Sequence, residues 1–233
     1  RLWKGEADTI KGSPALRLEL KSPDGEEGFP GNLTVASLVL LEPEGRMTIE
    51  YEAATDRKTP LNLCNHAYFN LRGEGSGSVL YHRLELRCSA YLPVDSRLIP
   101  LNGPPRPVEG GPFDFMIPKT LGRDIGVTKG GYDHCFVIDG NCTAEARPFA
   151  HLWEPDTGRN LRMWTSMPSV QLYTGNCLDG IKGKNGSVYG THDGVCLETQ
   201  FFPNSPNRDD YPSCIAEPGL PWRQRTEYQF SLD

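Results

Sequence analysis

The sequence predicts an all-β fold, a large antiparallel β-sandwich, from two observations. Glycine and proline supply 25 and 20 of the 233 residues, which interrupts the chain too often for long helices. Between these turns, short apolar stretches with period-two alternation recur, as expected for half-buried strands. No repeat, charge block or interdomain linker is visible, so residues 1–233 are expected to form a single domain.

Composition excludes several classes of protein. A net charge of -6 and scattered basic residues argue against a surface for nucleic acid or an anionic membrane. No apolar run approaches the ~20 residues that span a bilayer. The seven cysteines are odd in number and lack C-x-x-C spacing, which indicates neither a disulfide framework nor a metal site.

Reduced thiols are the simplest account of these cysteines, so a cytoplasmic location is expected. Three N-x-S/T triplets, at Asn32, Asn141 and Asn185, would instead suit a glycosylated, secreted protein. Such triplets often arise by chance and carry little weight against the thiols.

The first strands are predicted ahead of residue 54. Leu16–Leu20 alternates as LRLEL and is followed by the polar loop Ser22–Gly31. Leu33–Leu41 and Met47–Ala53 flank the turn Glu42–Gly45, which predicts a β-hairpin.

The next segment, Thr59–Leu71, is dense in groups that form hydrogen bonds. An isolated histidine is often a satisfied structural residue. Here, however, three asparagines and a tyrosine lie close to the histidine in sequence, which favours a polar surface that binds a ligand. The following Gly73–Ser78 lacks the Lys-Ser/Thr ending and helix of a phosphate loop, so a flexible turn is expected there. The polar residues of the segment are Asn62, Asn65, His66, Tyr68 and Asn70.

An Asp-His pair stands at the start of an apolar strand within Gly130–Ile138. Function tends to gather where loops meet strands, although a polar pair at such a position is also routine. Of the rest of the chain, two stretches are predicted to be irregular and five to be strands. Phe149–Trp153 and Leu161–Trp164 flank the turn Pro155–Gly158, which predicts a second hairpin. The irregular stretches are Tyr91–Gly111 and Asn176–Gly194; the other strands are Leu84–Cys88, Ser169–Gly175 and Thr226–Leu232.

The stretch Thr191–Arg208 is the first candidate for chemistry. Alternation from Val195 to Phe201 predicts a half-buried strand in which Glu198 shares a face with Cys196 and Gln200. A carboxylate among apolar neighbours loses hydration and gains proton affinity, which suits a general base. The alternative is a strand glutamate that points to solvent.

Motifs along nearly the whole chain resemble the aldose 1-epimerase (galactose mutarotase) family. Their number and order make chance similarity improbable. In chain order they are SPDGEEGFPGNLTV, TPLNLCNHAYFNLRGEGSG, YLPVDSRLIP, PFDF, GRDI, GYDHCFVID, VQLYTGNCLDG and HDGVCLETQFFPNSPN.

This resemblance implies a β-sandwich whose concave sheet holds a free aldose, without metal or organic cofactor. By motif, His66 in NHAYFNL matches the general acid to the ring oxygen, and Glu198 in CLETQ matches the base for the anomeric hydroxyl. Asp133 in GYDHCF and Gln171 in VQLYTGN match positions that bind sugar hydroxyls. The partner implied is therefore a small aldose such as glucose or galactose.

Mutarotation requires one basic and one acidic group at the same pH. The C1 hydroxyl loses a proton while the ring oxygen gains one, and after rotation about C1–C2 the roles are exchanged. Glutamate and histidine side chains, with unperturbed pKa values of roughly 4.3 and 6.5, satisfy this near neutrality.

The chain departs from the family at its start. Members carry there a segment with an Asn, a His-Gly-Gly type motif and an arginine near the sugar, whereas this chain opens with RLWK. The sandwich would then lack N-terminal strands, and a protein partner could cover the exposed surface. Cys64 stands where the motif usually has threonine.

Two alternatives to the enzyme stay open. One is a non-catalytic sugar-binding or structural subunit of a larger assembly. The other is a sugar-phosphate epimerase of related fold, which would need basic residues clustered at the pocket.

Overall fold

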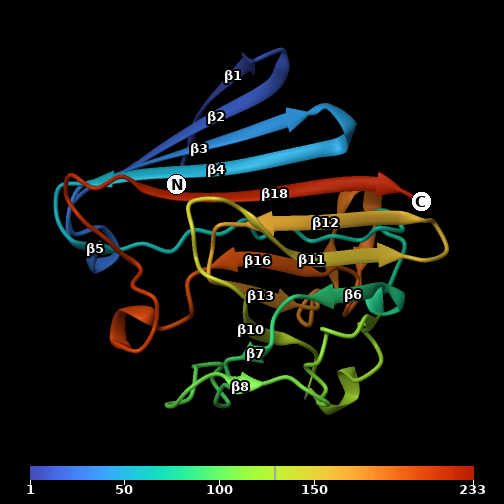
Figure 1. Ribbon diagram of the computed structural model, residues 1–233. Helices are drawn as coiled ribbons and strands as arrows, with labels where there is room; N and C mark the ends of the chain where they lie inside the picture. The colour runs from blue at the N-terminus through green and yellow to red at the C-terminus, as the bar shows by residue number, and fades with distance from the viewer. Residues whose placement is uncertain (129) are drawn as a thin grey trace.

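The computed structural model describes residues 1–128 and 130–233, whose strands form two large antiparallel sheets (Figure 1). In the nine-stranded sheet the order is β1 (Lys4–Ile10), β2 (Ser13–Ser22), β3 (Leu33–Glu42), β4 (Arg46–Thr55), β18 (Trp222–Leu232), β12 (Arg159–Thr165), β11 (Arg147–Glu154), β6 (Arg83–Leu86) and β9 (Lys119–Thr120). In the five-stranded sheet it is β16 (Cys196–Gln200), β13 (Ser169–Tyr173), β10 (Asp133–Val137), β7 (Ala90–Tyr91) and β8 (Arg106–Pro107).

Two small ribbons and six short 3₁₀ turns complete the described chain. The ribbons pair β14 (Ile181–Lys182) with β15 (Val188–Tyr189) and β17 (Ile215–Ala216) with β5 (Thr59–Pro60). The turns are η1 (Glu26–Gly28), η2 (Pro43–Gly45), η3 (Val79–Tyr81), η4 (Ile125–Val127), η5 (Lys184–Gly186) and η6 (Ser205–Asn207).

The predicted antiparallel β-sandwich is confirmed, including both hairpins. β3 and β4 pair in register through Val39↔Ile49 and turn at η2. β11 and β12 pair through Leu152↔Leu161, with a bulge near Pro148. Alternation was informative here because one face of each strand is buried.

The structure also contains strands that the sequence did not predict. β1, with the sequence KGEADTI, has no apolar alternation because six of its seven residues are exposed. Its pairing with β2 from Lys4↔Glu19 to Ile10↔Ser13 depends on backbone hydrogen bonds. The ribbon β14–β15 lies inside Asn176–Gly194, and β7 and β8 overlap the stretch predicted to be irregular. Two-residue strands leave no periodicity for a sequence to reveal.

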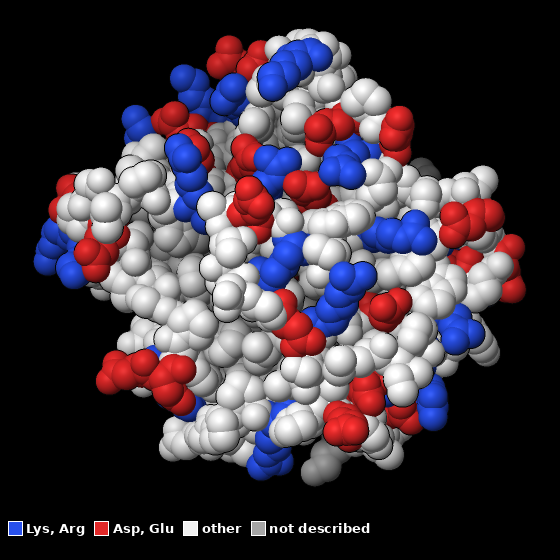
Figure 2. All heavy atoms as spheres, viewed as in Figure 1, with Lys and Arg blue, Asp and Glu red and all other residues white. Residues whose placement is uncertain are grey.

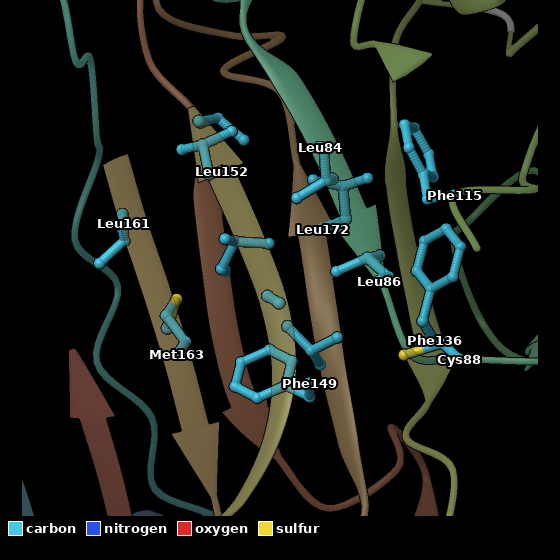
Figure 3. Close-up of a cluster of buried hydrophobic side chains, with 14 of the residues drawn as sticks. Leu84, Leu86, Cys88, Phe115, Phe136, Phe149, Leu152, Leu161, Met163 and Leu172 are labelled. Atoms are coloured by element: carbon cyan, nitrogen blue, oxygen red, sulfur yellow. The ribbon is translucent and has the colours of Figure 1, made fainter. Parts of the chain in front are cut away.

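The main hydrophobic core is built from side chains of both sheets (Figure 3). Phe136 and Leu172 come from the five-stranded sheet, while Leu152, Leu161 and Met163 come from the nine-stranded sheet. All five side chains are fully buried. The five-stranded sheet therefore has its other face free for a different use.

A buried polar chain joins the edge strand β16 to β18. The hydroxyls of Thr199 and Thr226 lie 2.7 Å apart, and that of Thr165 lies 3.2 Å from Thr226. Gln224 Nε2 donates to the Thr199 carbonyl at 3.0 Å. The bond from Gln224 satisfies the Thr199 carbonyl of this edge strand. Together, the bonds fix which face of β16 points to the core.

On the face of the molecule in Figure 2, positive and negative side chains are interspersed rather than gathered in one patch. All seven cysteines are free thiols. Within the described residues, no helix has the length and apolar character needed to cross a membrane.

Replacing Leu172 by alanine tests the core. Leu172 adjoins Gln171 in β13 but points between the sheets, so we expect Leu172→Ala to lower the free energy of unfolding by about 2–5 kcal/mol. The measurement is urea denaturation. The matched control, Val188→Ala at a 63% exposed position, should stay within about 0.5 kcal/mol of the parent. Equal effects of the two changes would contradict this packing.

Candidate active site

Glu198 lies on the face of β16 that points away from the core. It faces Gln171 across the β13–β16 ladder, whereas Leu197 belongs to the main core and Thr199 is held by the buried threonine chain. Glu198 is only 6% exposed. The prediction that it shares a face with Cys196 is confirmed by the pairing, and the alternative of a solvent-directed glutamate is wrong.

The segment between Asn62 and Phe69 is fastened to both ends of β16. At one end, the Asn62 side chain exchanges two hydrogen bonds with the backbone of Phe201, at 2.9 and 3.2 Å. At the other, the backbones of Phe69 and Val195 bond at 2.8 and 3.0 Å. The chain between these anchors therefore passes beside Glu198 and carries His66 to it.

His66 and Cys64 contact different oxygens of the Glu198 carboxylate. His66 Nε2 lies 3.4 Å from Oε1, and the Cys64 thiol donates to Oε2, also at 3.4 Å. Tyr68 stacks on the His66 ring with centroids 5.0 Å apart, while half of the His66 side chain stays exposed. The imidazole is thus oriented on one side and accessible on the other.

Burial raises the pKa of Glu198 above its ordinary value of 4.5. The nearby His66 and the hydrogen bond from Cys64 oppose this shift, and the carboxylate of Asp133 adds to it. Burial, together with the charge of Glu198, raises the pKa of the Cys64 thiol to about 12, so at neutral pH this group keeps the proton that it donates. Glu198 is therefore a carboxylate of increased proton affinity.

Asp133 and Gln171 extend the polar face across two further strands. Gln171 Nε2 donates to Asp133 Oδ1 at 2.7 Å. Gln171 Oε1 is buried and has no hydrogen-bond partner among the described residues. Buried acceptors are nearly always paired in native proteins, so this oxygen can accept from a donor other than the described residues.

A glycine is required where the chain enters β10. Gly131 has φ +119°, and a Cβ there would lie 2.0 Å from Asn176 Oδ1. The close approach lets the Asn176 side chain donate to the Tyr132 carbonyl at 3.1 Å. This contact holds the loop after β13 against the start of the strand that carries Asp133.

His66, Asp133 and Glu198 line a cleft of about 850 Å³, and Gln171 adjoins it through its hydrogen bond to Asp133. Such a volume falls in the range of small-molecule sites. None of the described residues that line the cleft is Lys or Arg, so the basic cluster needed for a sugar phosphate is not found among them. The cleft residues besides His66, Asp133 and Glu198 are Tyr68, Val94, Asp95, Ser96, Leu98, Thr128, Gly130, Gly131, His134, Tyr173, Asn176 and Cys177.

The three asparagines of the Thr59–Leu71 segment bond within the protein and are not among the residues that line the cleft. Asn62 anchors Phe201, as described above, and Asn70 Nδ2 donates to the carbonyls of Gly77 and Asp193. Asn65 Oδ1 accepts from the backbone N–H of Ala67. The many polar groups of this segment therefore include asparagines that hold its backbone in place. His66 and Tyr68 are the members of the segment that line the cleft.

Two other histidines have partners inside the protein. His82 Nε2 accepts from the Leu71 backbone at 2.9 Å, and burial lowers the pKa of this imidazole to about 4. The His134 ring packs on Phe113 at 4.6 Å, and burial also lowers its pKa. Of the predicted Asp-His pair, Asp133 therefore joins the polar face of the sheet and His134 packs among aromatic rings.

Sequence reasoning gave no role to several cleft residues. Asp95, Ser96 and Leu98 come from the stretch predicted to be irregular, and the motif YLPVDSRLIP that contains them was given no role in the site. Tyr173 could have been found, because it shares a face with Gln171 in the alternation of β13.

The fold is a large antiparallel β-sandwich with a cleft at its five-stranded sheet, and the chain belongs to the aldose 1-epimerase family, whose sequence pattern matches residues 1–229. It is 43% identical over 215 residues to the galactose mutarotase of Mus musculus, covering 91% of this chain and 61% of that protein. It is 37% identical over 218 residues to the aldose 1-epimerase of Escherichia coli K12, covering 91% and 62%. The chain thus spans about three fifths of the length of these relatives.

Solved structures agree with this assignment. An aldose epimerase homologue from C. elegans superposes with a TM-score of 0.86 at 28% identity, covering 98% of this chain and 69% of that one. The galactose 1-epimerase of Lactobacillus acidophilus gives 0.85 at 26% identity, covering 100% and 67%.

The raised pKa of Glu198 predicts a pH-dependent change in stability. The folded protein holds this proton more tightly than the unfolded chain, so ionised Glu198 lowers stability at neutral pH. We expect Glu198→Gln to be more stable than the parent near neutrality, and the difference to vanish as the pH falls below 4.5. Urea denaturation across this range measures it. Glu85→Gln, on the opposite sheet, is the control, and a destabilised Glu198→Gln at neutral pH would overturn the expectation.

Proposed function

We propose that this chain is an aldose 1-epimerase that interconverts the α and β anomers of a free hexose such as glucose or galactose. The observation that carries the proposal is the 3.4 Å separation of His66 Nε2 and Glu198 Oε1 at the wall of a sugar-sized cleft. The relatives named galactose mutarotase and aldose 1-epimerase support it.

In this proposal Glu198 takes the proton of the C1 hydroxyl while His66 gives one to the ring oxygen. Both sugar oxygens are bonded to C1, so the two protein groups must also lie close together, as they do. The ring opens to the aldehyde, C1–C2 rotates, and closure runs the two transfers in reverse. A buried carboxylate of increased proton affinity is a stronger base than an exposed one, which suits this step.

Asp133 and Gln171 are proposed to hold sugar hydroxyls. Their mutual hydrogen bond orients both side chains before a ligand arrives. The unpartnered Gln171 Oε1 would accept a hydroxyl, and the charged Asp133 would accept another. A site of this kind needs no metal or organic cofactor for the proton transfers.

Location and protein partners are further parts of the proposal. Seven free thiols support a cytoplasmic location. A protein partner is supported by exposed apolar side chains of β18 and β3, namely Phe230, Leu232 and Leu41. The non-catalytic alternative keeps the cleft but predicts no turnover.

Polarimetry of freshly dissolved α-D-galactose tests the reaction. We expect Glu198→Gln and His66→Asn each to lower kcat by about 10²–10⁴-fold, because each removes a general acid–base group. The matched controls are Glu85→Gln and His151→Asn, which pair across β6 and β11 on the other sheet and should leave the rate unchanged. An inactive parent chain would favour the non-catalytic alternative. If Glu198→Gln and His66→Asn both kept the rate of the parent, the proposed mechanism would be excluded.

A double-mutant cycle tests the sugar contacts. Asp133→Ala and Gln171→Ala should each lower kcat/KM for galactose about 10-fold, the value of one good hydrogen bond. Since the two side chains bond to each other, the double variant should lose less than the product of the single losses. Losses that multiply would mean that the two groups act independently, and unchanged KM values would place the sugar elsewhere.

A further inference from the structure

Three side chains with metal-binding atoms meet at the Glu198 carboxylate. A ring nitrogen of His66, Sγ of Cys196 and a carboxylate oxygen of Glu198 all lie within 4.8 Å of one another. Cys196 and Glu198 project from one face of β16, because they are two residues apart on a strand. His66 comes from the segment anchored beside that strand.

The distances suit a tetrahedral ion. Zn–N and Zn–O bonds of about 2.0–2.2 Å at the tetrahedral angle place two ligand atoms about 3.4 Å apart. His66 Nε2 and Glu198 Oε1 are 3.4 Å apart. Even if Sγ of Cys196 lies at the 4.8 Å limit from the other two ligand atoms, it would need to move by about 1 Å to form a Zn–S bond of about 2.3 Å.

The donor atoms and the charges both favour zinc over the hard cations. Imidazole and thiolate are ligands of Zn²⁺, whereas Mg²⁺ and Ca²⁺ take oxygen donors. Once an ion has displaced the proton of the Cys196 thiol, the resulting thiolate and the Glu198 carboxylate together cancel two positive charges, and Asp133 adds a further negative group close by. Among the described residues that line the cleft, no Lys or Arg side chain opposes a cation.

The hydrogen bond from Cys64 also prepares the carboxylate. The thiol of Cys64 holds Oε2 and leaves Oε1 directed at His66. Such supporting contacts orient the ligands of metal sites and change metal affinity when they are removed. The half-exposed His66 gives an ion access from the cleft.

We propose that His66, Cys196 and Glu198 form a binding site for Zn²⁺, whose fourth position is open to the cleft. Binding releases the Cys196 thiol proton to solvent and forms a Zn–S bond, with no change of oxidation state. Since the ion engages the two groups assigned to proton transfer, zinc is expected to inhibit mutarotation. Only this last step depends on the proposed function.

The test uses the whole chain and two metal probes. Co²⁺, which occupies zinc sites, reports a thiolate ligand through a sulfur-to-cobalt absorption band, and calorimetry gives the affinity for Zn²⁺. The parent should show the band, and Zn²⁺ should remove it. Cys196→Ser should lose the band and bind Zn²⁺ at least ~10-fold more weakly.

Cys177→Ser is the matched control, because this exposed thiol also lines the cleft but lies outside the cluster. It should keep the band and the affinity of the parent. His66→Asn, at a half-exposed position, provides a second variant should Cys196→Ser fold poorly, and it should also weaken Zn²⁺ binding at least ~10-fold. A parent without the band, or a band that survives Cys196→Ser and disappears in Cys177→Ser, would overturn the site.

Inhibition is read against each variant's own rate without zinc. The parent and Cys177→Ser should be inhibited over the concentration range in which calorimetry shows binding, and Cys196→Ser should need at least ~10-fold more zinc. Binding without inhibition would retain the metal site and count against the proposed roles of His66 and Glu198. Inhibition that ignores the Cys196 change would refute the site.

Discussion

The orientation of the short edge strand β16 is the constraint on which the rest depends. Leu197 in the core and Thr199 in the buried threonine chain fix one face of this strand toward the nine-stranded sheet. Side chains alternate along a strand, so Cys196 and Glu198 must take the other face. A shift of one residue would bury the carboxylate in the core and expose Leu197, which explains why so many contacts hold the register.

The same constraint raises the proton affinity of Glu198 and lowers the stability of the fold when this side chain is ionised. The strand, Cys64 and the Asn62–Phe69 segment remove water from the carboxylate, and this burial raises its pKa. A solvent-exposed glutamate would lower the free energy of unfolding less, and it would be a weaker base. Side chains that lower stability in this way are expected at functional sites. The unpartnered Gln171 Oε1 is a second example on the same sheet.

Much of the fold was predictable because strands buried on one face alternate visibly. The hairpins β3–β4 and β11–β12 and the face of Glu198 followed from that alternation. The meeting of His66 with Glu198 followed only from resemblance, since it depends on the anchors Asn62 and Phe69, which join positions remote in sequence. β1 and the two-residue strands could not be predicted, because backbone pairing leaves no pattern in side chains.

The most direct measurement of the central claim is a crystal structure of this chain with galactose bound. The account predicts the C1 hydroxyl within hydrogen-bond distance of Glu198, the ring oxygen within that distance of His66, and other hydroxyls on Asp133 and Gln171. A sugar bound away from the face of β16, or one whose anomeric carbon lies beyond reach of both groups, would contradict it.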